Sequence, residues 1–145
     1  MCDATPEATV TLPSSVLAPS LARDFVERHI CPHHGDTAEG AVKLVTSELV
    51  TNAVLYGEPP VSIRLACAER EIRVEVADGN DQKPVISGSH EGLGLLLVQK
   101  VANDWGTLGT TSGKIVWCAV PTGILPLPVP RAGTGDRARP YYRSR

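Results

Sequence analysis

The stretch Leu44–Gly57 reads Leu-Val-Thr-Ser-Glu-Leu-Val-Thr-Asn-Ala-Val-Leu-Tyr-Gly and contains no Pro or internal Gly. Its apolar residues recur at helical spacing, which predicts a helix with one apolar stripe. Glu48 and Asn52 lie beside that stripe, and about 3.6 residues per turn stack them on one side. A carboxylate and a carboxamide on a mostly apolar helix are costly unless a polar or charged group meets them. Hydrated Mg²⁺ with phosphates would meet them, since Mg²⁺ prefers oxygen ligands; local hydrogen bonds at an exposed edge are the alternative.

Length and composition indicate one globular domain. The chain has 145 residues, 42% of them hydrophobic, which is enough for a real core. No apolar run reaches the roughly 20 residues that span a bilayer. The segment Met1–Glu7 has neither the basic start nor the apolar centre of a signal peptide. We therefore expect a cytoplasmic protein without a membrane anchor.

The cysteines and the charge exclude other classes of protein. Cys2, Cys31, Cys67 and Cys118 form no Cys-x-x-Cys pair, so reduced thiols are expected. In Cys31-Pro-His33-His34 the candidate ligands are adjacent rather than spaced on one face, which disfavours a metal cluster. Residues 121–145 carry five Arg and one Asp, a charge of +4. Because the whole chain has a net charge of −2, the remaining residues carry −6. An acidic globule of this kind is not expected to bind nucleic acid directly.

The order of elements predicts the fold class. We expect strands over 7–12, 61–66, 72–76, 105–110 and 114–120, and helices over 14–30, from about 36 to 57, and over 95–101. Pro32 and Gly35 are expected to break the first helix, and Asp36 or Thr37 is expected to cap the second. Strands grouped apart from helices indicate an α+β two-layer sandwich, with a mixed, mostly antiparallel sheet and helices on one face. The chain lacks the strand–helix alternation of a Rossmann fold, and it has no P-loop motif.

Two further motifs follow the helix that carries Glu48. Asp78, before Gly79 at a strand end, can accept a hydrogen bond from an exocyclic amine such as adenine N6, although a turn Asp is the ordinary alternative. Gly92 and Gly94 let backbone approach a ligand, and the helix that follows would point N–H groups at phosphates. A flexible connector is the alternative for this Gly-x-Gly.

In this order the motifs resemble the ATP-binding domain of the GHKL superfamily, the fold of histidine-kinase catalytic domains and gyrase. Glu48…Asn52 is similar to its N box, Asp78-Gly79 to its G1 box, and Gly92-Leu93-Gly94 to its G2 box. The chain most resembles the small anti-sigma-factor serine/threonine kinases and their actinobacterial-type relatives, through residues 47–54, 92–98, 105–106 and 113–117. The resemblance covers about residues 7–120. We therefore expect an ATP-binding domain over 1–120 and a disordered Pro/Arg-rich tail over 121–145.

The resemblance implies cofactors and roles for individual residues. It implies that ATP and Mg²⁺ bind, with Asn52 as the Mg²⁺ ligand and Glu48 as the general base or the group that orients the nucleophile. The residues implied to hold the nucleotide are Asp78 and Gly79 at the adenine, and Gly92, Leu93, Gly94 and Leu95 at the phosphates.

Three positions depart from the family pattern. Asn80 replaces the glycine that usually stands two residues after the Asp, and Leu93 stands where many relatives have a basic residue. Lys114 lies near the position where other relatives place a Thr close to the base. The loop 79–91 is a short lid.

Three functions remain open at this point. The first is a serine/threonine kinase that phosphorylates an anti-sigma-factor antagonist and otherwise sequesters a sigma factor. The second is an ATP-dependent binding module that holds a regulatory partner without transferring phosphate. The third, a detached histidine-kinase catalytic domain, is disfavoured because the four histidines lie in no segment resembling a phosphoacceptor domain. The resemblance also implies a homodimer.

Overall fold

The structure, a computed structural model, describes residues 7–81 and 90–122, without the side chains of 33–37 and 90–95. Its elements are β1 (Ala8–Leu12), α1 (Ala18–His29), α2 (Pro32–Tyr56), β2 (Val61–Cys67), β3 (Glu71–Asp78), α3 (His90–Val101), β4 (Asp104–Thr110) and β5 (Gly113–Pro121). The succession of strands and helices is the one expected from the sequence. The tail beyond 122 and most of the expected lid lie outside the described residues, so both remain predictions.

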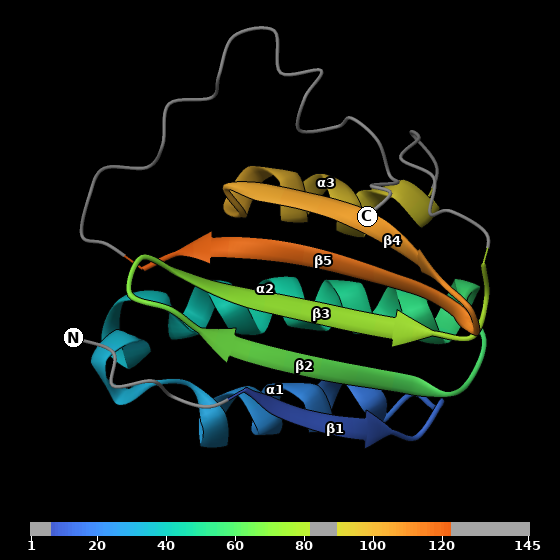
Figure 1. Ribbon diagram of the computed structural model, residues 1–145, viewed down its shortest axis with the longest axis horizontal. Helices are drawn as coiled ribbons and strands as arrows, with labels where there is room; N and C mark the ends of the chain where they lie inside the picture. Colours follow the sequence, from blue (N-terminus) through green and yellow to red (C-terminus); the bar gives the residue numbers. More distant parts are fainter. Residues whose placement is uncertain (1–6, 82–89, 123–145) are drawn as a thin grey trace, which may run out of the picture.

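The five strands form one sheet in the order β1-β2-β3-β5-β4. All four pairings between described strands are antiparallel, where a mixed, mostly antiparallel sheet was expected. The three helices lie together behind the sheet in the view of Figure 1, and its other face is turned to the viewer. This arrangement confirms the α+β two-layer sandwich.

The core lies between the sheet and α2. Alternate residues of the central hairpin face the helices and are at most 1% exposed: Val61, Ile63 and Leu65 of β2, and Ile72, Val74 and Val76 of β3. In β5 the same face carries Val116, Cys118 and Val120. Burial raises the pKa of the Cys118 thiol to about 12, so this cysteine stays protonated at neutral pH and cannot serve as a nucleophile.

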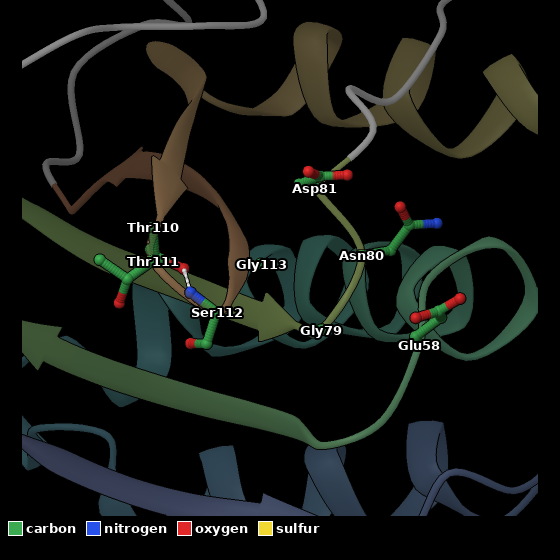
Figure 2. Close-up of a pocket in the computed structure, with 8 residues that line it drawn as sticks. All are labelled: Glu58, Gly79, Asn80, Asp81, Thr110, Thr111, Ser112 and Gly113. Atoms are coloured by element: carbon green, nitrogen blue, oxygen red, sulfur yellow. Dashed lines mark hydrogen bonds between the residues drawn. The ribbon is translucent and has the colours of Figure 1, made fainter.

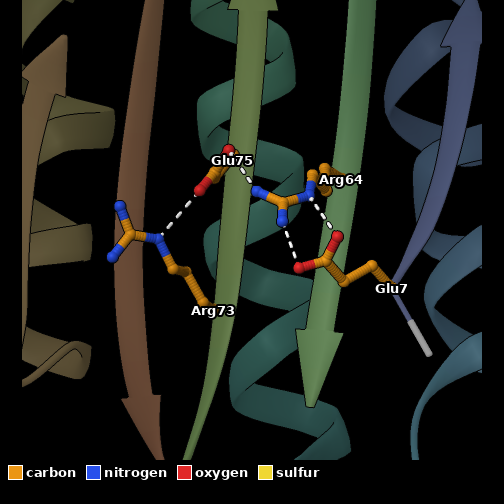
Figure 3. A network of polar contacts seen from close by, with 4 residues as sticks. All are labelled: Glu7, Arg64, Arg73 and Glu75. Carbon is orange, nitrogen blue, oxygen red and sulfur yellow. Dashed lines mark hydrogen bonds and ion pairs between the residues drawn. The ribbon is translucent and has the colours of Figure 1, made fainter. Parts of the chain in front are cut away.

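The opposite face of the sheet carries charges that pair with one another (Figure 3). Glu75 accepts from Arg64 Nη1 at 3.1 Å and from Arg73 Nε at 2.9 Å, and Arg64 also binds Glu7. The hydrogen bond from Arg64 lowers the pKa of Glu7, and the same contact raises the pKa of Arg64. The Arg73 guanidinium lies 4.3 Å from the centre of the Trp117 ring. These charges are therefore satisfied within the sheet, and the candidate site lies elsewhere.

Helix α2 begins four or five residues earlier than the sequence predicted. Its first residue is Pro32, so Gly35 does not end a preceding helix, and Asp36 and Thr37 lie inside α2 rather than capping it. Proline is tolerated at the first helical position, because its φ is already helical and its missing N–H needs no partner there. The predicted break at Pro32 is therefore a helix start.

The other two helices also start at different residues than expected. Helix α1 begins at Ala18 rather than Ser14, because Ser15 accepts hydrogen bonds from the N–H groups of Leu17 and Ala18 and forms a turn. Helix α3 begins at His90, before the Gly-x-Gly motif, where a start at Leu95 was expected. No helix of 7–81 and 90–122 is long and apolar enough to cross a membrane.

Candidate functional site

Three elements meet at one end of the molecule. The last turns of α2, the carboxyl end of β3 and the first turns of α3 lie together at the right of Figure 1, and α2 packs against both other elements. Two hydrogen bonds fasten β3 to α2: Gly79 N–H donates to the Glu58 carbonyl at 2.6 Å, and Asn80 Nδ2 donates to the Tyr56 carbonyl at 3.3 Å. The N-box and G1-box segments are thus neighbours in space.

Glu48 and Asn52 lie on the flank of α2 that is turned away from α1. Ser47 marks the flank next to α1, because its Oγ accepts a hydrogen bond from Arg23 Nη1 of α1 at 2.9 Å. At about 100° per residue, Glu48 lies about 100° and Asn52 about 140° around the helix from Ser47. Since α2 packs between α1 and α3, both side chains lie on the flank towards α3.

The polar groups of this flank lack partners among the described residues. Glu48 and Asn52 are both half-buried. Asn52 Nδ2 is buried without a hydrogen-bond partner, and Glu48 forms no salt bridge within the described chain. A buried polar group without a partner costs about 1–3 kcal/mol. The flank therefore combines a buried amide nitrogen without a partner with a half-buried carboxylate.

Asp78 is buried and already paired. Its Oδ1 accepts from Asn80 N–H at 2.7 Å and from Lys114 Nζ at 3.0 Å, and its Oδ2 lies 2.9 Å from the same Nζ. The side chains of Asp78 and Lys114 are 2% and 8% exposed. The carboxylate therefore reaches any nucleotide base only together with its lysine, and contact with adenine remains a prediction.

Lys114 was expected only as a departure from the family pattern, and its pairing with Asp78 was not expected. The signal was present in the alternation of both strands. Asp78 continues the inward row of Val74 and Val76, and Lys114 opens the inward row of Val116 in β5. A carboxylate and an ammonium directly opposite each other on the buried face of an antiparallel pair are expected to form an ion pair.

The backbone of Gly57 packs directly against the Asp78 carboxylate. A Cβ at Gly57 would lie 2.6 Å from Asp78 Cγ and 2.6 Å from the Ala53 carbonyl oxygen, which is closer than carbon contacts allow. At Gly40, in the same helix, a Cβ meets nothing within 4 Å. A side chain at position 57 would therefore displace Asp78, whereas position 40 has space for a side chain.

We expect Gly57→Ala to lower the free energy of unfolding by about 1–3 kcal/mol, the usual cost of overpacking. The matched control Gly40→Ala should raise it by up to about 1 kcal/mol, because alanine is the better helix former. Urea unfolding followed by circular dichroism measures both. Equal effects of the two substitutions would show that Gly57 does not pack on Asp78 as described.

The G2-box residues lie inside α3, and their side chains are outside the described part of the structure. Gly92 and Gly94 lie in the first described turns of α3, next to residues outside the described ranges. Phosphate binding by this segment remains a prediction.

A polar pocket of about 460 Å³ adjoins the Asp78–Lys114 pair (Figure 2). Glu58, residues 79–81 and the β4–β5 turn at 110–113 line it. Gly79 and Gly113 are chain neighbours of the two paired residues, so the pocket lies against the pair. Its volume is in the range of about 300–1,000 Å³ typical of small-molecule sites. Glu48 and Asn52 do not line it.

No cluster of three His, Cys, Asp or Glu suited to a metal occurs in the described ranges.

Comparison with known proteins gives a family match and similarity in fold to solved structures. The model of a family described as the histidine kinase-like ATPase domain matches residues 13–119. A solved structure, the RsbU and RsbW domains of Rv1364c from Mycobacterium tuberculosis, is similar in fold, with a TM-score of 0.54 and 16% sequence identity. The match covers 84% of this chain and 34% of that one, so this chain spans about a third of the length of that structure. A search of curated proteins found no match.

Proposed function

The chain belongs to the histidine kinase-like ATPase domain family, and from this we propose that it is an ATP-binding regulatory protein with serine/threonine kinase activity. Its substrate would be a serine of an anti-sigma-factor antagonist, and its other partner a sigma factor that it sequesters. The resemblance of residues 47–54 and 92–98 to anti-sigma-factor kinases supports these partners, as does the similarity in fold to a structure that contains an RsbW domain. A homodimer in the cytoplasm is part of the same proposal.

The observation that carries this proposal is the pair of polar groups without partners on α2. A half-turn of the Asn52 amide puts its oxygen where the buried, unpartnered nitrogen lies. An amide oxygen beside a half-buried carboxylate is a donor set that suits Mg²⁺, so the residues present fit Mg²⁺–ATP. When bound, Mg²⁺ neutralises charge on the phosphates. Asn52 would hold the ion, and the backbone of Gly92, Leu93, Gly94 and Leu95 would bind phosphate oxygens.

Glu48 would accept the proton of the attacking hydroxyl. The serine oxygen forms a bond to the γ-phosphorus, the bond from that phosphorus to the β–γ bridging oxygen breaks, and ADP leaves. The hydroxyl proton passes to the Glu48 carboxylate, for which the described chain offers no counter-ion. A protein that only binds ATP has less use for a carboxylate placed one turn before the ligand Asn52.

Two measurements on the purified protein test the proposal. Isothermal titration calorimetry should show ATP binding in Mg²⁺ and none in EDTA. With γ-labelled ATP and candidate antagonist proteins, label should appear on a serine of the antagonist. An ATP-dependent complex that acquires no label would instead identify the protein as a non-catalytic binding module. The absence of ATP binding in Mg²⁺ would overturn both functions.

A further inference from the structure

The Asp78–Lys114 pair is the feature of the site that its family resemblance does not explain. A buried ammonium lies at 3.0 and 2.9 Å from the two oxygens of the carboxylate, and at 3.1 Å from the Asn80 carbonyl oxygen. Both side chains are almost completely buried. Replacing such a pair by apolar residues often costs no stability, so stability alone is weak grounds for it.

We propose that Lys114 is a positioning residue for the nucleotide base, one that restricts Asp78 to accepting a single exocyclic N–H. The inference rests on the proposed ATP binding and specifies which base edge the site takes.

A count of donors and acceptors supports this restriction. Lysine has three N–H donors, and the three contacts to Asp78 Oδ1, Asp78 Oδ2 and the Asn80 carbonyl account for all of them. Asp78 Oδ1 accepts twice, from Lys114 and from Asn80 N–H, whereas Oδ2 accepts once in the described structure. Because each carboxylate oxygen has two lone pairs, one acceptor position remains, on Oδ2. By this count Asp78 Oδ2 can accept one more hydrogen bond, and Lys114 has no N–H left to offer an acceptor.

The surrounding backbone fixes the carboxylate in this state. Asp78 and Lys114 are register partners in the β3–β5 ladder, so neither can shift along its strand alone. The backbone of Gly57 packs against the carboxylate from α2. A Cβ at Gly113 would overlap the Asp78 carbonyl oxygen, which shows how closely the two strands approach here. A base must therefore match the pair as it stands.

This geometry selects a 6-aminopurine over a 6-oxopurine. The exocyclic amine of adenine supplies the one donor that Oδ2 can accept. The keto oxygen of hypoxanthine at the same place would face a carboxylate oxygen and would find no donor on Lys114, whose N–H groups are already bound. We expect ATP to bind at least about tenfold more tightly than inosine triphosphate, the effect of one hydrogen bond to a charged group.

Replacing the lysine should reduce this selectivity. In Lys114→Met the buried carboxylate loses its counter-charge, and the pattern of donors and acceptors that the lysine imposes on Asp78 is lost. We expect the ratio of the two dissociation constants to fall to within about threefold of unity, and Lys114→Arg to retain a preference for ATP. Lys43→Met is the matched control, because Lys43 pairs with Glu27 on the α1 side of α2 and should leave the ratio unchanged.

The experiment is calorimetric titration of the four proteins with ATP and with inosine triphosphate in Mg²⁺, with folding checked by circular dichroism. A folded Lys114→Met with the wild-type ratio would make the lysine purely structural and overturn the inference. Equal binding of both nucleotides by the wild-type protein would also overturn it, even if the variants fail to fold. Binding of neither nucleotide by the wild-type protein would instead overturn the proposed function, and this inference with it.

Discussion

Asn52→Ala should weaken binding of Mg²⁺–ATP at least about 100-fold. Removing a residue that only orients a metal ligand typically lowers metal affinity about 10–100-fold, and removing the ligand itself should cost more. The free energy of unfolding without nucleotide should not fall. Asn52 Nδ2 has no partner to lose within the described chain, and alanine favours the helix more than asparagine does. Calorimetric titration and urea unfolding measure the two effects separately.

Asn103→Ala is the matched control for that variant. Asn103 also has a buried amide atom without a partner, but it precedes β4 and lies outside the N-box helix. It should leave ATP affinity unchanged. Equal losses of affinity in the two variants, or retained affinity in Asn52→Ala, would remove Asn52 from the site.

Glu48→Gln should lower the rate of phosphate transfer about 10²–10⁴-fold, the usual contribution of a general base. The dissociation constant of ATP should stay within about threefold of the wild-type value, because the amide keeps the shape of the side chain and an oxygen. Single-turnover transfer from γ-labelled ATP to the antagonist separates the two quantities.

Glu39→Gln is the control for the Glu48 variant. It changes a carboxylate of the same helix, but this one pairs with Lys43. It should transfer phosphate at the wild-type rate. If Glu48→Gln also transfers at that rate, Glu48 is not the base, and another group must accept the hydroxyl proton.

The sheet and its buried face could be predicted from the sequence because two simple patterns determine them. Strict alternation of Val61, Ile63 and Leu65 against polar residues fixes one face of the central hairpin, and β3 repeats it. The uninterrupted apolar stripe of Leu44–Gly57 likewise fixes the buried side of α2. The two polar residues beside that stripe were expected to need a partner, and both remain without one in the described chain.

The first residues of the helices were predicted less accurately than the sheet, because Pro and Gly have different effects inside a helix and at its terminus. Pro32 was interpreted as a break, although it occupies the first helical position. Gly92 and Gly94 were interpreted as a loop before a helix, whereas the backbone is helical from His90 onwards.

Alternation along the strands puts Lys114 and Asp78 on the buried face, but it does not show that the two residues lie opposite each other. The loss of a Thr near the base was noted, but the register that places Lys114 opposite Asp78 follows only from strand pairing. With that pairing, the substitution adds a charge beside the Asp78 carboxylate rather than only removing a hydroxyl. Lys114 therefore belongs to the candidate site as much as the motif residues do.

The most direct test of the account is where the metal of the nucleotide complex lies. Manganese can replace Mg²⁺ in the ATP complex, and its paramagnetism broadens the NMR signals of nearby amides. Added in small amounts, Mn²⁺–ATP should first broaden the backbone amides of residues 48–53 in α2, and leave those of Arg64 and Glu75 on the opposite face of the sheet sharp. Broadening centred on that opposite face, or none at Glu48 and Asn52, would contradict the site.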